Sequence, residues 1–296
     1  MDRKLLLRKL TPYAFLAPAV AVFAIALIYP VFYSLRLSFF RFGFTDILEG
    51  GTFVGFGNYI KVLQSPQFHT TLKVTGIFIS VTLAAELLIG LVLALLAENN
   101  LKGLRIFRTV FLLPIMIAPV VVGVIWRYLF NPTYGIVNYL LGLFGFESVS
   151  WLSQPGTALT AIILTDIWQW TPFVFLLLLA GLQNVPVQVL EASVVDGAGY
   201  FQRLFHVKLP LIKTTIGLTI VLRLIDALRA LVVMFIMTSG GPGMSTEVLS
   251  LHIYKTAFVS HRLGQASTLA MFLILMLLAI SVVILWLFRT ERRQVA

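Results

Sequence analysis

The sequence predicts an all-α membrane protein with six transmembrane helices. Of its 296 residues, 59% are apolar and 11% are charged, whereas soluble domains are about 45–50% apolar and about 25% charged. The apolar residues gather in six runs long enough to cross a hydrocarbon core of about 30 Å, which takes about 20 helical residues. A β-barrel would instead show alternating segments of about ten residues.

In chain order the six runs are 14–33, 74–96, 110–129, 158–182, 216–237 and 269–288. We expect each to be a helix, because a backbone in lipid must satisfy its hydrogen bonds within the segment. The first run follows a basic stretch, as the apolar core of a signal peptide does. It is longer than such a core and ends at Tyr29 and Pro30 without a cleavage site of small residues, so we interpret it as a span.

Basic residues predict which side of the membrane each loop faces. The two termini and the loops 97–109 and 183–214 carry 13 lysines and arginines, and the three opposite loops carry 6. Because short basic loops stay in the cytoplasm, we expect both termini there, with tails 1–13 and 289–296 flanking a membrane domain over 14–288. The net charge of +10 is then a topology signal, and no nucleic-acid partner is expected.

The sequence lacks the motifs of several common enzyme classes. It has no cysteine, which excludes thiolate metal sites and cysteine nucleophiles. No glycine precedes a lysine, so a phosphate-binding P-loop cannot form. The four histidines do not have metal-ligand spacing. We therefore expect neither an enzyme nor a cofactor or metal bound by this chain.

The most patterned loop, 184–212, predicts two short helices separated by a turn. Pro186 suits a helix start, and Gly197, with Gly199 close behind, tolerates the left-handed conformation that ends many helices. The apolar positions expected on the helix faces are Val189, Leu190, Val194 and Val195, then Tyr200, Phe201, Leu204 and Phe205. These residues alone leave open an amphipathic elbow that lies on lipid headgroups.

Part of this loop resembles the EAA motif of permease subunits in binding-protein-dependent ABC importers. The residues that carry the likeness are Glu191, Ala192 and Ser193, then Asp196, Gly197 and Ala198, closed by Leu209 and Pro210. Ser193 stands where the motif has alanine. In that family the loop forms a coupling helix seated in a groove of the ATPase subunit, and the resemblance implies this role for the first six of these residues.

Other short runs resemble the carbohydrate branch of the family, the maltose-type and glycerol-phosphate-type permeases. They are Leu16-Ala17-Pro18, Tyr29-Pro30, Phe56-Gly57-Asn58-Tyr59, Leu113-Pro114, Gly135-Ile136-Val137-Asn138 and Thr238-Ser239-Gly240-Gly241-Pro242. The resemblance implies a type I ABC importer permease fold with a core over residues 70–288 and the loop 184–212 as its cytoplasmic coupling loop.

The resemblance also implies partners for this chain. It implies a second, homologous permease in a heterodimer, two copies of an ABC ATPase that use ATP and Mg²⁺, and an extracytoplasmic solute-binding protein. The surrounding bilayer would be a bacterial or archaeal plasma membrane.

Six charged residues lie inside or at the ends of the predicted spans: Glu86, Arg127, Asp166, Arg223, Asp226 and Arg229. A charge near the bilayer centre costs at least about 2.5–3.5 kcal/mol, so these residues need partners or water. For Glu86 we expect a buried polar contact with another helix. Asp166 precedes Trp168, Gln169 and Trp170, a cluster that either anchors at an interface or offers its rings to a sugar.

Arg223, Asp226 and Arg229 recur every third residue, a spacing at which side chains on a helix meet. They either form an internal Arg–Asp–Arg ladder or line a translocation cavity, where guanidinium and carboxylate groups bind hydroxyls in pairs. We therefore take these three, with the Trp168–Trp170 cluster, as candidates for the substrate pathway. The ladder's net positive charge leaves open an anionic polyol such as glycerol phosphate.

Together these features predict the transmembrane subunit of an ABC importer for a sugar or sugar-derived solute, driven by ATP hydrolysis in a separate subunit. The alternative is an ion-coupled secondary transporter or a channel, in which Asp166 and Asp226 would serve a coupling ion. A patterned cytoplasmic loop has no role in that alternative.

Overall fold

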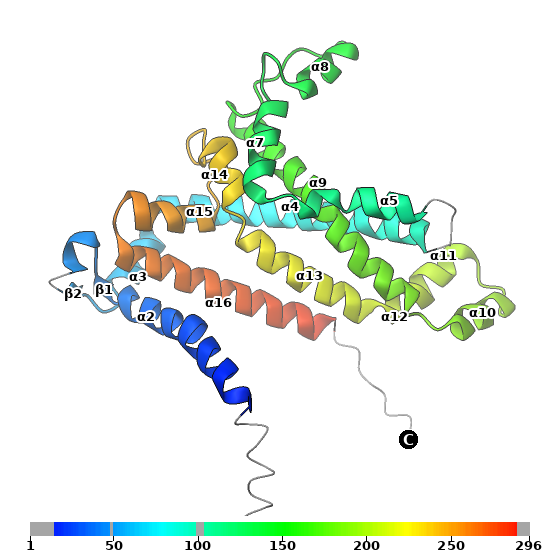
Figure 1. Cartoon of the computed structure of the whole chain (residues 1–296), viewed down its shortest axis with the longest axis horizontal. Coiled ribbons are helices and arrows are strands. Elements are labelled where there is room, and N and C mark those ends of the chain that lie inside the picture. Colours follow the sequence, from blue (N-terminus) through cyan, green and yellow to red (C-terminus); the bar gives the residue numbers. More distant parts are fainter. Residues whose placement is uncertain (1–14, 48–49, 99–103, 289–296) are drawn as a thin grey trace, which may run out of the picture. The chain divides into compact units, whose positions relative to one another are not determined.

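The computed structural model describes residues 15–47, 50–98 and 104–288 (Figure 1). The predicted tails, 1–13 and 289–296, lie outside the described residues. Regular structure in the described part is helical apart from one antiparallel pair of strands, β1 (Phe40–Arg41) and β2 (Thr52–Phe53). The helical class predicted from the sequence is therefore confirmed.

Four helices of the described chain are long and apolar enough to cross a membrane. They are Phe15–Ser38, which contains the π-helical turn η1 (Ala24–Ile28) and α2 (Tyr29–Ser38), then α4 (Pro66–Ala97), α9 (Pro155–Gln183) and α16 (Leu263–Leu287). They coincide with the first, second, fourth and sixth predicted spans. With 32 residues, α4 is about 48 Å long at 1.5 Å per residue and exceeds the hydrocarbon core.

The third predicted span, 110–129, is not one continuous helix, so that prediction was wrong. The structure has α5 (Leu104–Phe111), α6 (Leu113–Met116) and α7 (Pro119–Leu129) in its place. Ile117 and Ala118 are extended, with ψ of 130° and 137°. Proline disfavours helical backbone in the residue before it and has no N–H to donate, so Pro119 starts a new helix.

The fifth predicted span, 216–237, is also broken, into α13 (Lys213–Leu228) and α14 (Val232–Thr238). No proline or glycine lies between these helices, so the break has no local sequence signal. Tertiary contact stabilises it, because the Ser250 hydroxyl on α15 (Leu249–Tyr254) donates to the Ala230 carbonyl at 2.8 Å.

The contacts divide the chain into two compact units, and the smaller comprises residues up to Ser65 with Ile253–Phe272. It holds the strand pair, η2 (Phe44–Ile47), α3 (Gly57–Gln64) and η4 (Lys255–Val259). Asn58 braces it, because its buried side-chain amide donates to the carbonyls of Ser38 at 2.9 Å and Phe40 at 2.8 Å. The recognised run that contains Asn58 is thus a structural brace.

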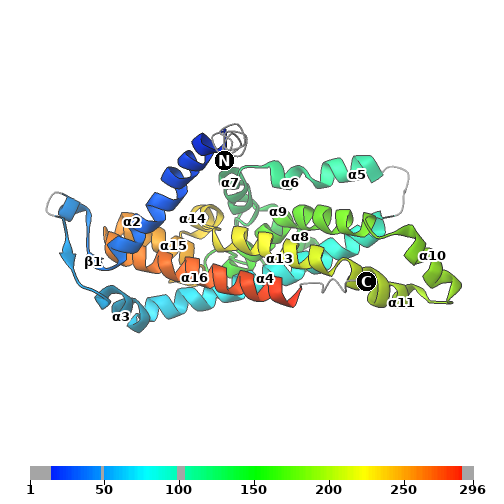
Figure 2. The same ribbon diagram turned by 90° about the horizontal axis from the view of Figure 1, so that it is seen from below.

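In the larger unit, α4 and α9 pack along each other, and α13 packs on both. The apolar core between α4 and α9 extends into the loop that follows α9, through Val185 and Ile212. Its other buried members are Ala94, Ala97, Val174, Phe175, Leu178, Leu179 and Leu182. Gly90 permits the close approach, since a Cβ there would lie 2.9 Å from Cγ1 of Val174. Next to these helices, α7 and α14 lie side by side (Figure 1 and Figure 2).

The connection from α7 to α9 contains α8 (Ile136–Leu143) and is organised by one amide. The Asn138 Oδ1 accepts from the Trp151 indole at 2.9 Å, and its Nδ2 donates to the Ser148 hydroxyl and the Val149 carbonyl, both at 2.9 Å. The recognised run that ends at Asn138 therefore fixes the shape of this loop.

Candidate functional site

The loop 184–212 forms helix, turn and helix, as the sequence predicted. It comprises α10 (Val187–Val195), α11 (Tyr200–Arg203), the π-helical turn η3 (Leu204–Lys208) and α12 (Leu209–Leu211). Pro186 is the N-cap of α10, with extended backbone. Gly199 is the N-cap of α11, and its N–H donates to the Gln202 side chain at 2.9 Å.

Gly197 ends α10 in the left-handed conformation, with φ of +76°. Its N–H donates to the Val194 carbonyl, and the Ala198 N–H donates to the Ser193 carbonyl, both at 3.0 Å. These two bonds form a Schellman motif, which satisfies carbonyls at the helix end and reverses the chain. The predicted left-handed turn at Gly197 is confirmed.

The motif residues of α10 divide between an outer and an inner face. Glu191, Ala192 and Asp196 are exposed. Ser193 is buried, and its hydroxyl donates to the Leu190 carbonyl at 2.6 Å. A carboxylate on the outer face is therefore available to a partner, while a small residue faces the body of the protein.

The apolar faces predicted for the two loop helices are mostly uncovered within the described chain. Only Leu204 is buried and Leu190 is half-buried. Exposed apolar residues remain on both helices: Val187, Val189, Val194, Val195, Tyr200, Phe201 and Phe205. Contiguous exposed apolar surface marks a site for a protein or membrane partner.

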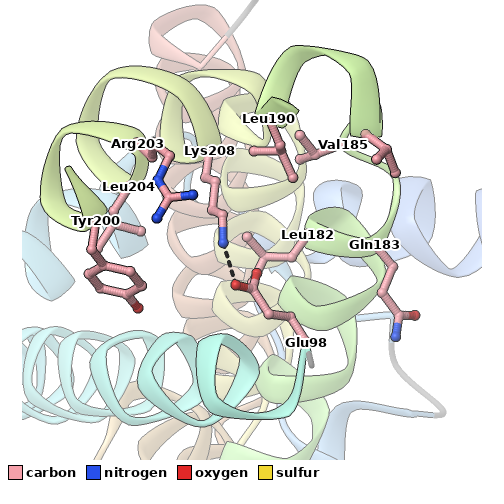
Figure 3. Close-up of a pocket in the computed structure, with 10 residues that line it drawn as sticks. Glu98, Leu182, Gln183, Val185, Leu190, Tyr200, Arg203, Leu204 and Lys208 are labelled. Carbon is pink, nitrogen blue, oxygen red and sulfur yellow. Dashed lines mark hydrogen bonds and ion pairs between the residues drawn. The ribbon is translucent and has the colours of Figure 1, made fainter. Parts of the chain in front are cut away.

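Two contacts tie the loop to the membrane helices. Lys208 forms an ion pair with Glu98, which directly follows α4 (Figure 3). Val185 and Ile212, at the two ends of the loop, belong to the apolar core of α4 and α9. This ion pair was not predicted from the sequence, although an acid at the end of one span and a base near the start of another were a usable signal.

A buried charge cluster joins α4, α9 and α13. The Arg223 guanidinium donates to both carboxylate oxygens of Glu86, from Nε at 2.6 Å and from Nη2 at 2.9 Å, and Nη2 also binds Asp166. The exposed fractions of Arg223, Glu86 and Asp166 are 1%, 0% and 6%. The Trp170 ring covers the guanidinium, with its centroid 4.9 Å from Cζ, a distance typical of a cation–π contact.

This cluster confirms the expected interhelical contact of Glu86 and differs from the internal ladder. The partners of Arg223 lie on other helices. Asp226 is half-buried and Arg229 is exposed at the C-cap of α13. Within the part of the chain that the structure describes, neither side chain has a hydrogen bond or an ion pair.

The remaining pathway candidates lie near the broken third span. Gln169 is buried, and its amide donates to the Ile117 carbonyl at 3.3 Å. It therefore satisfies a group freed where α6 ends. Trp168 is 39% exposed and packs edge to face with Trp126, with ring centroids 5.5 Å apart.

Comparison with known proteins places this arrangement in one family. Residues 86–293 match the family described as "Binding-protein-dependent transport system inner membrane component". The chain belongs to this family. The match runs from the middle of α4 through α16 and so includes both the charge cluster and the loop 184–212.

Full-length relatives support the assignment. A trehalose/maltose transport system permease protein of Thermococcus litoralis is 35% identical, over 95% of this chain and 94% of that protein. A sulfoquinovosyl glycerol transport system permease protein of Agrobacterium fabrum is 36% identical, over 93% and 89%. A chain in the crystal structure of a bacterial alginate ABC transporter, bound to its alginate-loaded periplasmic protein, has a TM-score of 0.80 at 25% identity, over 94% and 93%. The fold is that of a type I ABC importer permease, as the sequence predicted.

The charge cluster predicts that buried Arg223 and exposed Arg229 differ greatly in their contribution to stability. Replacement of Arg223 by Met leaves two buried carboxylates without a cation, which should destabilise this permease by about 3–5 kcal/mol. Replacement of exposed Arg229 by Met should change stability little. Thermal unfolding of the purified transporter in detergent measures both, and equal stability of the two variants would contradict the cluster's role.

The left-handed conformation of Gly197 predicts that most side chains placed there destabilise the loop. Gly197→Ala introduces a Cβ into open space but at φ of +76°, which costs roughly 1 kcal/mol. Gly197→Asn is the control, because the short polar side chain of asparagine tolerates the left-handed conformation. Hydrogen exchange of the peptide over 187–203 should be about fivefold faster in the first variant. Equal exchange in both would refute the cost assigned to Gly197.

Proposed function

We propose that this chain is the membrane-spanning permease subunit of an ABC importer for a sugar or sugar-derived solute. The observation that carries the proposal is the exposed EAA-like loop, anchored on membrane helices, in a chain of the binding-protein-dependent family. The sequence contains no P-loop, so ATP hydrolysis with Mg²⁺ is assigned to a partner ATPase. The chain is a transport subunit and not an enzyme.

We further propose six spans with both termini in the cytoplasm. Four spans are the long apolar helices, and the other two are the broken helices α5–α7 and α13–α14. The asymmetry of basic residues supports this orientation. The assembly would contain a second permease as a heterodimeric partner, two ATPase copies and an extracytoplasmic binding protein, in a bacterial or archaeal plasma membrane.

In this proposal α10 is the coupling helix. Glu191 and Asp196 face a basic groove of the ATPase, where a carboxylate forms charge-assisted hydrogen bonds. The exposed apolar residues Val189, Val194 and Val195 of α10 fill the rest of the contact. Ala192 and Ala198 keep the docked surface shallow, and Ser193 packs inward. ATP binding and hydrolysis then move the loop and drive alternating access.

The substrate pathway is proposed to run past the broken helices, because discontinuous helices line solute sites in transporters. Asp226 and Arg229 have no side-chain hydrogen bond or ion pair within the described chain, and Trp168 is 39% exposed. These three residues are assigned to solute contact. Arg223, Gln169 and Trp170 are engaged within the chain and are assigned to positioning. The exposed Arg229 guanidinium keeps an anionic polyol such as glycerol phosphate as the alternative substrate.

The runner-up function, an ion-coupled transporter or channel, is less well supported. It requires intramembrane carboxylates free to bind an ion, and of its two candidates the Asp166 carboxylate is bound to Arg223, which leaves Asp226 alone. It also leaves the exposed loop motif without a partner.

Sidedness is testable with single cysteines, because the chain has none of its own. Lys213→Cys, at the start of α13, should react with an impermeant thiol reagent in inverted vesicles and not in intact cells. Glu147→Cys, in the loop before α9, should show the reverse. Labelling of Lys213→Cys in intact cells would overturn the orientation and the assignment of the coupling loop.

Charge reversal at Glu191 tests the coupling role. Glu191→Lys should reduce binding of the ATPase by about tenfold or more, since it removes a charge-assisted hydrogen bond and adds repulsion. The amphipathic-elbow alternative predicts indifference, because lysine suits an anionic membrane surface. Glu147→Lys, the same change at an exposed site in the loop before α9, is the control. Wild-type ATPase binding by Glu191→Lys in the purified complex would end the coupling proposal.

A further inference from the structure

A cavity of about 580 Å³ lies between the coupling loop and the helix ends that carry it (Figure 3). Its floor includes Glu98 after α4 and Leu182 near the end of α9, and its roof includes Leu190, Arg203 and Lys208 from the loop. The volume is within the range of about 300–1,000 Å³ typical of small-molecule sites. The partners proposed above do not account for it.

The charges in the cavity do not balance. Lys208 is paired with Glu98, whereas Arg203 has no ion pair within the described chain, and its buried Nε has no hydrogen-bond partner. Figure 3 shows the Arg203 and Lys208 side chains descending side by side from the loop helices toward Glu98. Two cations against one carboxylate leave one positive charge for an anionic ligand.

The other lining residues are apolar except Gln183 and Tyr200. The level of the cavity relative to the bilayer follows from its floor. Leu182, Leu190 and Leu204 contribute hydrocarbon surface. The floor is formed at the ends of α4 and α9, two helices long enough to cross a bilayer. In the orientation proposed above, these ends lie beyond the hydrocarbon core, on the headgroup side. Basic pockets between membrane helices on the cytoplasmic side bind anionic headgroups.

We propose that this cavity binds the phosphate headgroup of an anionic phospholipid. The Arg203 guanidinium presents a planar fork of donors that matches phosphate oxygens, and Tyr200 and Lys208 line the same space. The acyl chains would follow the leucine wall toward the bilayer. The inference rests on the cytoplasmic placement of the loop proposed above, and not on its contact with the ATPase.

The Glu98–Lys208 pair makes the proposal sharper. Glu98 repels an incoming phosphate and occupies the Lys208 ammonium. Removal of its charge should therefore strengthen lipid binding, whereas removal of Arg203 should weaken it. A purely structural role for both residues predicts no such opposite effects on binding.

The experiment measures lipid binding to the purified whole transporter in detergent, by native mass spectrometry with added phosphatidylglycerol or phosphatidylcholine of identical acyl chains. We expect phosphatidylglycerol to bind more tightly than phosphatidylcholine. Arg203→Gln should weaken phosphatidylglycerol binding by about tenfold, the factor for one charge-assisted hydrogen bond. Glu98→Gln should strengthen it, and Lys213→Gln, an exposed neighbour outside the cavity, should leave it unchanged.

Equal binding of the two lipids, or phosphatidylglycerol binding that is unaffected by Arg203→Gln, would overturn the proposal. A further arm adds soluble glycerol phosphate as a competitor. If the ligand is a lipid, glycerol phosphate should displace it only at millimolar or higher concentrations, and this displacement should depend on Arg203. Tight, Arg203-dependent binding of soluble glycerol phosphate in place of lipid would reject that source. ATPase content, read from the same spectra, separates this result from failure of the coupling role, which depends on Glu191.

Discussion

The Arg223 guanidinium holds three helices, α4, α9 and α13, in register. Glu86 on α4 and Asp166 on α9 both bind it, and all three groups are buried. An unpaired charge in such a place costs several kcal/mol. A slide of any one helix by a turn, about 5.4 Å, would separate a carboxylate from its cation. The cluster therefore fixes the register of α4, α9 and α13, and with it the level of everything attached to their ends.

The need to pair buried polar groups also applies to the backbone of the broken helices. Backbone groups freed inside a membrane must find partners in the protein, and donors from neighbouring helices supply them here. Gln169 binds the Ile117 carbonyl, Ser250 binds the Ala230 carbonyl, and Arg127 donates to the Ile236 carbonyl at 3.1 Å. These hydrogen bonds stabilise the breaks, so Gln169, Ser250 and Arg127 have a structural role.

Structural features with a local sequence signal could be predicted, whereas features set by tertiary packing could not. The loop turn at Gly197 follows from the conformational freedom of glycine, and the long spans follow from apolar run length. The break before Pro119 had a local signal that run length concealed, whereas the break after Leu228 has none. The cluster shows the same limit: the three charges were visible in the sequence, but spacing within one helix favoured Asp226 as the partner of Arg223, and only packing brings Glu86 and Asp166 to it.

The charge cluster and the loop 184–212 are joined through α4, α9 and α13. Glu86 lies 12 residues before Glu98, Asp166 lies 16 residues before Leu182, and Arg223 lies 11 residues after Ile212. Along helices these separations are about 16–24 Å. All three helices that the cluster joins therefore have one end at the loop 184–212, and α4 and α9 share an apolar core with it. In the proposed importer, a displacement of α10 would move these helices together. Relative motion must then be absorbed elsewhere, and the segment between α13 and α14, directly beyond the clamped helix, is where the backbone is already non-helical.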